Sequence, residues 1–231
     1  MKNKVKHNKT VLVVSAHPDD ETIGCGGAIL NHVAQGDSVF WLNVTGVSDH
    51  HPHGFTKEFI KGRSQLILRV AEEYGFTRSY NLQLPTMMLD TIPLYDLVKK
   101  IDRVVSEIEP NTIYLPNRSD VHSDHRVVFQ AAYACTKNFR KPYIREIFMY
   151  ETLSETEFAP AVPESMFTPN TYVDITDYMA RKLEIVRMYD TELMPAPMPR
   201  SEYAIKSLAG YRGSRIGVRY AEAFQSIYRV L

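Results

Sequence analysis

An apolar run near the start of the chain ends in side chains that can bind metal or transfer protons. The run Val11–Val14 leads into Ala16-His17-Pro18-Asp19-Asp20-Glu21. In an open α/β sheet, ligands bind beyond the carboxyl ends of buried strands. Pro18 has no N–H to donate and therefore ends the strand ladder at this point. This histidine and the three carboxylates are the first candidate site.

A second polar cluster follows a second apolar run. The strand expected over Thr112–Leu115 leads into Asn117–Arg126, which contains His122 and His125. The apolar residues after His125 keep helical spacing, so the two imidazoles lie at a junction between a loop and a helix. Residues three apart on a helical turn face the same way. We therefore expect both imidazoles to converge on one point.

The two clusters together offer a set of metal ligands. Neutral imidazole and carboxylate suit zinc, and a catalytic zinc keeps three protein ligands and one open position. His17 and Asp20 from the first strand end and His125 from the second could form that set. Asp19 and His122 would then lie unligated beside it. A free carboxylate there could act as a general base, and a free histidine could stabilise developing negative charge.

Simpler interpretations compete with this one. The acidic run could cap the helix expected over Thr22–Val33, and His122 and His125 could be ordinary surface or capping residues. A dinucleotide-binding turn is disfavoured because Ile29 stands where that fingerprint needs its third glycine, and because carboxylates repel a pyrophosphate. The metal interpretation is favoured because complementary ligand residues follow both expected strands.

Three motifs of this chain resemble the zinc-dependent LmbE-like/PIG-L deacetylase family. They are Ala16-His17-Pro18-Asp19-Asp20-Glu21, then Asp120-x-His122-x-Asp124-His125, and last Tyr211–Val218 with Tyr220–Phe224. The resemblance covers nearly the whole chain. It implies removal of the acetyl group from an N-acetylated sugar, commonly an N-acetylglucosamine unit, with one zinc ion per chain.

The resemblance also implies roles for single residues. His17, Asp20 and His125 match the zinc-ligand positions. Asp19 matches the general base, and His122 matches the histidine near the oxyanion. We expect His122 to be protonated in that role.

Substrate contacts are less strongly indicated. Arg63, on the helix expected over Lys57–Tyr74, matches a sugar-contacting arginine of the family, but Leu66 stands where many relatives carry glutamate. A solvated helix residue is an equal alternative for Arg63. Asp90 could accept hydrogen bonds from sugar hydroxyls or cap the amphipathic segment that follows it. Asp120 is expected to orient an imidazole.

Strand-like and helix-like segments alternate along the chain. This order predicts a single α/β domain over residues 1–231, with a Rossmann-like, mostly parallel sheet and helices on both faces. A chain of 231 residues is large enough for one well-buried domain. Residues 1–9 are expected to form a mobile basic terminus. The expected strands are Val11–Val14, Ser38–Val44, Tyr80–Leu84, Thr112–Leu115 and Ile147–Tyr150.

Composition argues against several classes of partner. The 27 Lys and Arg residues balance 27 Asp and Glu residues, so no net field favours nucleic acid or an anionic membrane. No apolar run approaches the ~20 residues of a membrane span, and a cytoplasmic protein is expected. The expected partner is a small or conjugated amino-sugar substrate. The sequence leaves the oligomeric state open, and a homo-oligomer is compatible with it.

Other interpretations of the chemistry stay open at this point. The same ligands accept Fe2+ or Co2+ as well as zinc. The protein could be a zinc amidohydrolase acting on another acyl amide, or a catalytically silent sugar-binding protein. His50, His51 and His53 form a rival cluster, which we interpret as a polar lid rather than a metal site. The tyrosines of Ser201–Gly213 could stack on a sugar or pack in the core.

Overall fold

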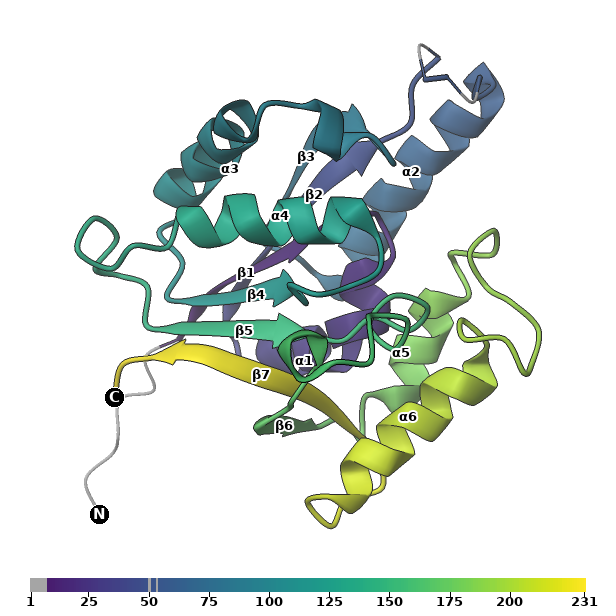
Figure 1. Cartoon of the computed structure of the whole chain (residues 1–231). Coiled ribbons are helices and arrows are strands. Elements are labelled where there is room, and N and C mark those ends of the chain that lie inside the picture. The colour runs from purple at the N-terminus through teal and green to yellow at the C-terminus, as the bar shows by residue number, and fades with distance from the viewer. Residues whose placement is uncertain (1–7, 50, 53) are drawn as a thin grey trace.

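A single seven-stranded sheet organises the computed structural model, which describes residues 8–49, 51–52 and 54–231 (Figure 1). The strand order is β3-β2-β1-β4-β5-β7-β6. Strands β1 to β5 pair in parallel, and β7 pairs antiparallel with both β5 and β6. The predicted fold class is therefore confirmed. The strands are β1 Thr10–Ser15, β2 Ser38–Gly46, β3 Arg78–Pro85, β4 Thr112–Pro116, β5 Glu146–Tyr150, β6 Thr171–Asp174 and β7 Ala221–Arg229.

Helices cover both faces of this sheet, as predicted. Figure 1 shows α3 and α4 on one face and α1 and α2 on the other. Helix α2 has the bounds expected from the sequence. The helices are α1 Asp20–Ala34, α2 Lys57–Tyr74, α3 Leu94–Ile108, α4 Ser123–Ala134, α5 Met179–Val186 and α6 Glu202–Ser214, with two short 3-10 turns, η1 Leu89–Thr91 and η2 Pro163–Ser165.

Strand β1 lies between two hydrophobic cores. Val11 and Val13 pack into the core shared with α1 and α2, whereas Leu12 and Val14 pack into the core shared with α3 and α4. Successive side chains of a strand point to opposite faces. A strand buried on both faces therefore needs a continuous apolar run, which is what the sequence provides.

Helix α1 is broken at Cys25, where φ is −143° and ψ is 20°. The N–H groups of Gly27 and Ala28 instead donate to the two carboxylate oxygens of Glu222, at 2.8 and 2.7 Å. Glu222 on β7 thus caps the second half of the helix. A Cβ at Gly27 would lie 2.5 Å from the Ile175 side chain, so the glycines after β1 serve close packing.

The sheet has a topological switch point between β1 and β4. After β1 the chain forms β2 and β3 on one side, and it then crosses to form β4 and β5 on the other. The crevice outside the carboxyl ends of such strands is the usual ligand site of open α/β sheets. Both predicted polar clusters follow these two strands.

The predicted basic terminus falls mostly on residues 1–7, outside the described residues, but Lys9 is anchored, since its Nζ lies 2.6 Å from Glu146. No helix in the described part of the chain is long and apolar enough to span a membrane.

Candidate metal and catalytic site

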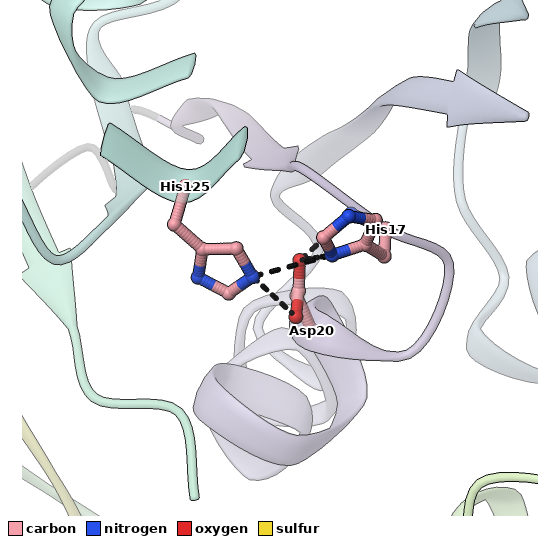
Figure 2. A group of neighbouring side chains, drawn as sticks. All are labelled: His17, Asp20 and His125. Carbon is pink, nitrogen blue, oxygen red and sulfur yellow. Dashed lines mark hydrogen bonds and ion pairs between the residues drawn. The ribbon is translucent and has the colours of Figure 1, made fainter. Parts of the chain in front are cut away.

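His17, Asp20 and His125 converge at the switch point (Figure 2). His17 follows β1, Asp20 begins α1, and His125 lies in the first turn of α4. His125 Nε2 is 3.3 Å from both His17 Nδ1 and Asp20 Oδ1, and His17 Nδ1 is 3.7 Å from Asp20 Oδ2. A tetrahedral ion bound at about 2.0–2.1 Å needs donor atoms about 3.3–3.4 Å apart. The spacing fits one ion held by three side chains.

The Asp20 carboxylate has one oxygen that the protein does not satisfy. Oδ2 accepts a hydrogen bond from the backbone N–H of His17 at 2.8 Å. Oδ1 is buried and has no hydrogen-bond partner among the described residues. An unsatisfied buried acceptor is costly. A cation between the three side chains would remove that cost, so the residues fit a metal.

Two further carboxylates fix the orientation of the imidazoles. His17 Nε2 lies 3.0 Å from Asp124 Oδ2, and His125 Nδ1 lies 2.8 Å from Asp120 Oδ2. Because an ionised carboxylate only accepts, the ring nitrogen facing it carries the hydrogen and the opposite nitrogen keeps its lone pair. Both lone pairs then face the ion position. Asp124 belongs to the second motif, but we predicted no role for it.

Asp20 and His125 support each other electrostatically. Burial alone would raise the pKa of Asp20, but the adjacent His125 and His17 outweigh it and hold that pKa well below its usual range. Burial alone would lower the pKa of His125, but Asp20 and Asp120 raise it well above the ordinary histidine value. In the metal-free protein these carboxylates stabilise a proton on His125, and a metal cation at the same place would replace that proton.

His122 lies beside the three converging side chains, but its Nδ1 already accepts a hydrogen bond. Nδ1 accepts a hydrogen bond from the backbone N–H of Asp124 at 3.1 Å, so the residue caps α4. Burial, and then the charge of His17, lower the pKa of His122 to about 4. The ring is therefore neutral near pH 7 with its hydrogen on Nε2. This differs from the protonated His122 that we expected.

Hydrogen bonds to the histidine nitrogens distinguish between two groups of residues that could hold a metal ion. Ligand atoms of His17, His122 and Asp124 also lie within 4.8 Å of one another. In that group, however, His17 Nε2 is bonded to Asp124 and His122 Nδ1 caps the helix. The group with the unsatisfied Asp20 oxygen is the better metal site.

Asp19 lies buried next to the same three side chains in a strained backbone conformation. Its φ is 145°, a region that non-glycine residues rarely adopt, and its N–H donates to Glu21 at 3.1 Å. Burial, and then the neighbouring Asp20, raise its pKa well above the usual range, although Arg200 opposes the rise. Arg200 Nη1 lies 2.9 Å from Asp19 Oδ2. Such a carboxylate is suited to take up a proton.

A cavity of about 250 Å³ opens onto these side chains. Its lining comprises His17, Pro18, Asp19, Thr45, Gly46, Val47, Phe55, Phe59, Arg63, Thr86, Met87, His122, Glu192 and Arg200. Arg63 donates to the carbonyl of Pro18 at 2.8 Å and lies 3.2 Å from Glu192. Glu192 is thus the acidic partner of Arg63, in place of the glutamate that many relatives carry at the position of Leu66.

Asp90 does not line this cavity. It is exposed in η1, and Pro93 rather than Asp90 occupies the N-cap of α3.

The predicted histidine lid and the two candidate stacking tyrosines do not line this cavity in the described part of the chain. His50 and His53 of the rival cluster are outside the described residues, while His51 is buried and its Nε2 bonds to the carbonyl of Thr86 at 2.8 Å. Tyr203 and Tyr211 lie on α6 with about two thirds of their surface exposed, and neither lines the cavity. They are therefore neither core residues nor cavity residues.

Sequence reasoning missed Arg200, Glu192 and the two phenylalanines of the cavity. Glu192 and Arg200 flank the Pro-rich stretch Met194–Pro199, which we predicted as a surface loop. Neither residue stands in a motif or at a strand end. Their proximity to Asp19 depends on tertiary packing, so no local pattern could have identified them.

Comparisons with known proteins agree with this geometry. A family model described as PIG-L, GlcNAc-PI de-N-acetylase, matches residues 12–136. Diacetylchitobiose deacetylase of Thermococcus kodakarensis is 26% identical over 231 residues, covering 95% of this chain and 83% of that protein. The uncharacterized deacetylase YaiS of Escherichia coli is 30% identical over 167 residues, covering 68% and 82%.

A solved structure shares the whole fold. The N,N'-diacetylchitobiose deacetylase from Pyrococcus horikoshii superposes with a TM-score of 0.74 and 24% identity. The match covers 98% of this chain and 86% of that one. The similarity therefore extends beyond the region of the family match, to β5, β6 and β7.

Proposed function

Because the chain belongs to the PIG-L family, described as GlcNAc-PI de-N-acetylases, we propose that it is a metal-dependent hydrolase that removes the acetyl group from an N-acetylated amino sugar. The observation that carries this proposal is the convergence of His17, Asp20 and His125 beside a buried, unligated Asp19. The two relatives named as deacetylases support it.

We propose that His17 Nδ1, Asp20 Oδ1 and His125 Nε2 hold one zinc ion, with Asp124 and Asp120 orienting the imidazoles. Fe2+ and Co2+ suit the same donors. When bound, such an ion supplies Lewis acidity that polarises the amide carbonyl and lowers the pKa of water toward neutrality.

Asp19 performs the proton transfers in this proposal. It takes a proton from the attacking water as the water oxygen bonds to the acetamide carbon. The C–N bond then breaks, and the same proton passes to the leaving amine, so that the products are acetate and a free amino sugar. The raised pKa of Asp19 favours both steps near neutral pH. Arg200 holds one carboxylate oxygen in place.

His122 serves the oxyanion as a neutral donor. Because its Nδ1 accepts from the Asp124 backbone, its Nε2–H is available to the carbonyl oxygen as negative charge develops there. His122→Ala should lower kcat by about 10²–10³-fold, the usual cost of an oxyanion donor. An unchanged kcat in that variant removes this role.

Arg63 is the proposed sugar contact in the cavity. Its Nη1 is buried without an aligned hydrogen bond, although it pairs electrostatically with Glu192. A sugar hydroxyl could accept from it. Asp90 lies outside the cavity lining and has no place in this mechanism.

The decisive experiment measures acetate release and metal content on the same preparation. The zinc-loaded protein should release acetate from N-acetylglucosamine or its conjugates and should carry one ion per chain. Binding of these sugars without acetate release would instead favour the silent sugar-binding alternative. Acetate release from simple acyl amides but from no sugar would favour the amidohydrolase alternative.

A further inference from the structure

Part of the catalytic cavity is aromatic. Phe55 and Phe59 line it together with Asp19 and His122. We propose that this phenylalanine pair binds the group that is glycosidically attached to the N-acetylated sugar, and that this group presents an uncharged, apolar face, such as the C–H face of a second pyranose or an aryl ring. The inference rests on the proposed deacetylase function and names its substrate class.

The pair is stacked and anchored before any substrate arrives. The two ring centroids are 5.4 Å apart and the planes are inclined by 12°. Phe55 also contacts the ring of His51 at 5.0 Å, and His51 is bonded to the carbonyl of Thr86. Phe59 nevertheless leaves 39% of its surface exposed. A fixed, exposed aromatic surface inside a cavity is suited to stacking against an apolar face.

The position of the pair along α2 sets its distance from the reaction. Phe59 precedes Arg63 by four residues, which is one helical turn or about 6 Å along the axis. Arg63 itself contacts Pro18, next to Asp19. Figure 1 shows the first turns of α2 extending beyond the edge of the sheet. On α2, Phe59 therefore stands one helical turn farther from Pro18 than Arg63 does, a rise comparable to the length of one hexose unit.

The charges of the cavity argue against a phosphate at this place. The arginines of the cavity are already paired, Arg200 with Asp19 at 2.9 Å and Arg63 with Glu192 at 3.2 Å. No lysine stands among the described residues that line the cavity. Arginine binds phosphate through charge-assisted hydrogen bonds, for which these two guanidinium groups would have to give up part of their pairing with Glu192 and Asp19. The pairing therefore favours an uncharged attached group over a nucleotide or a phosphate-linked lipid.

The test compares four substrates on the metal-loaded enzyme. These are N-acetylglucosamine, its β-phenyl glycoside, a β-linked N-acetylglucosamine disaccharide and N-acetylglucosamine 1-phosphate. The variants are Phe55→Ala and Phe59→Ala, and the matched control is Phe139→Ala, whose side chain is 78% exposed outside the cavity. Acetate release gives kcat/KM for each pair of enzyme and substrate.

We expect the wild type to prefer the phenyl glycoside or the disaccharide over both the monosaccharide and the phosphate. A preference for the disaccharide identifies a second sugar, and a preference for the phenyl glycoside identifies an aryl group. In Phe59→Ala, the ratio of kcat/KM for the preferred substrate to kcat/KM for the monosaccharide should fall about tenfold. This is the size of an aromatic stacking contribution. The fall should come from a higher KM for the preferred substrate. The control should keep the wild-type ratio.

Three results overturn the proposal. They are an unchanged ratio in both phenylalanine variants, an equal loss on all four substrates, and a wild-type preference for the 1-phosphate. Each of these results requires that the wild-type enzyme still releases acetate. A wild type that releases acetate from no substrate would contradict the proposed function itself, so the two failures are distinguishable.

Discussion

Asp19 and Asp20 are adjacent in the chain but have opposite electrostatic surroundings. His125 and His17 overcome the burial of Asp20 and lower its pKa, whereas burial and the neighbouring Asp20 raise the pKa of Asp19. Paired carboxylates whose pKa values are pushed apart usually have different chemical roles. This contrast supports Asp20 as a ligand and Asp19 as the proton carrier.

These two roles predict different losses on substitution. Asp19→Asn should retain the metal and lose most of its turnover, because the ligands remain but the proton acceptor is gone. His125→Ala should lose metal affinity first. Metal content by mass spectrometry and acetate release on the same samples would distinguish the two variants. Equal metal loss in both would contradict the assignment.

Arg200 should control the pH range over which Asp19 works. Its guanidinium opposes the rise in the pKa of Asp19, so its removal should raise that pKa further. A general base acts only when deprotonated. The acidic limb of the kcat/KM profile should therefore move to higher pH in Arg200→Met.

The matched control for this prediction is Arg187→Met. Arg187 pairs with Glu202 on the surface and does not line the cavity. Its profile should match that of the wild type. An acidic limb that stays in place in Arg200→Met would show that Arg200 does not act through Asp19.

The residues of the site differ in how far the sequence could reveal them. Two apolar runs that favour buried strands precede the predicted site residues, and parallel strands bring their carboxyl ends together. These residues are His17, Asp19, Asp20, His122 and His125. Arg200 reaches the site from a segment that has no such constraint. Its position is set by tertiary contacts with Ser154 and Glu155.

At the scale of elements, β7 holds the broken helix α1 in place. Glu222 accepts from Gly27 and Ala28 and pairs with the buried Lys182 Nζ at 2.7 Å. Helix α1 carries Asp20 at its first position. The C-terminal motif Tyr220–Phe224, to which the sequence assigned no role, thus supports the helix that positions Asp20.

Loss of this carboxylate should destabilise the protein. Glu222→Ala leaves two N–H groups and the Lys182 ammonium without their acceptor, and removing one partner of a buried pair costs about 3–5 kcal/mol. Urea unfolding of this variant and of Glu202→Ala, which removes a surface ion pair with Arg187, would measure this difference. A Glu222→Ala loss below about 1 kcal/mol would contradict the capping role.

Elements were predictable where burial imposes a pattern. The five parallel strands lie within two residues of their expected ends. The central strands β1 and β4 are buried on both faces and need uninterrupted apolar runs, whereas the edge strand β3 alternates apolar and polar residues. Strand β7 was not predicted, since it contains alanines and a glutamate that strands usually disfavour. Its glutamate, Glu222, caps the second half of α1.

At the scale of the whole molecule, strand order brings the site together. Strands β1 and β4 are neighbours at the switch point, although more than ninety residues separate them in the chain. Helix α2 and the segment around Glu192 and Arg200 then form the walls of the cavity above it. The carboxyl ends of the strands thus carry the proposed metal ligands, the proposed base and the proposed substrate contacts.

The most direct test of this account is a metal titration of the chelated protein, with acetate release from N-acetylated sugars as the readout. We expect the chelated protein to be inactive and its activity to rise with added zinc, reaching a maximum at one ion per chain. Asp19→Asn should bind the same ion without gaining activity. Full activity in the chelated protein, or one bound ion without acetate release from any N-acetylated sugar, would contradict the account.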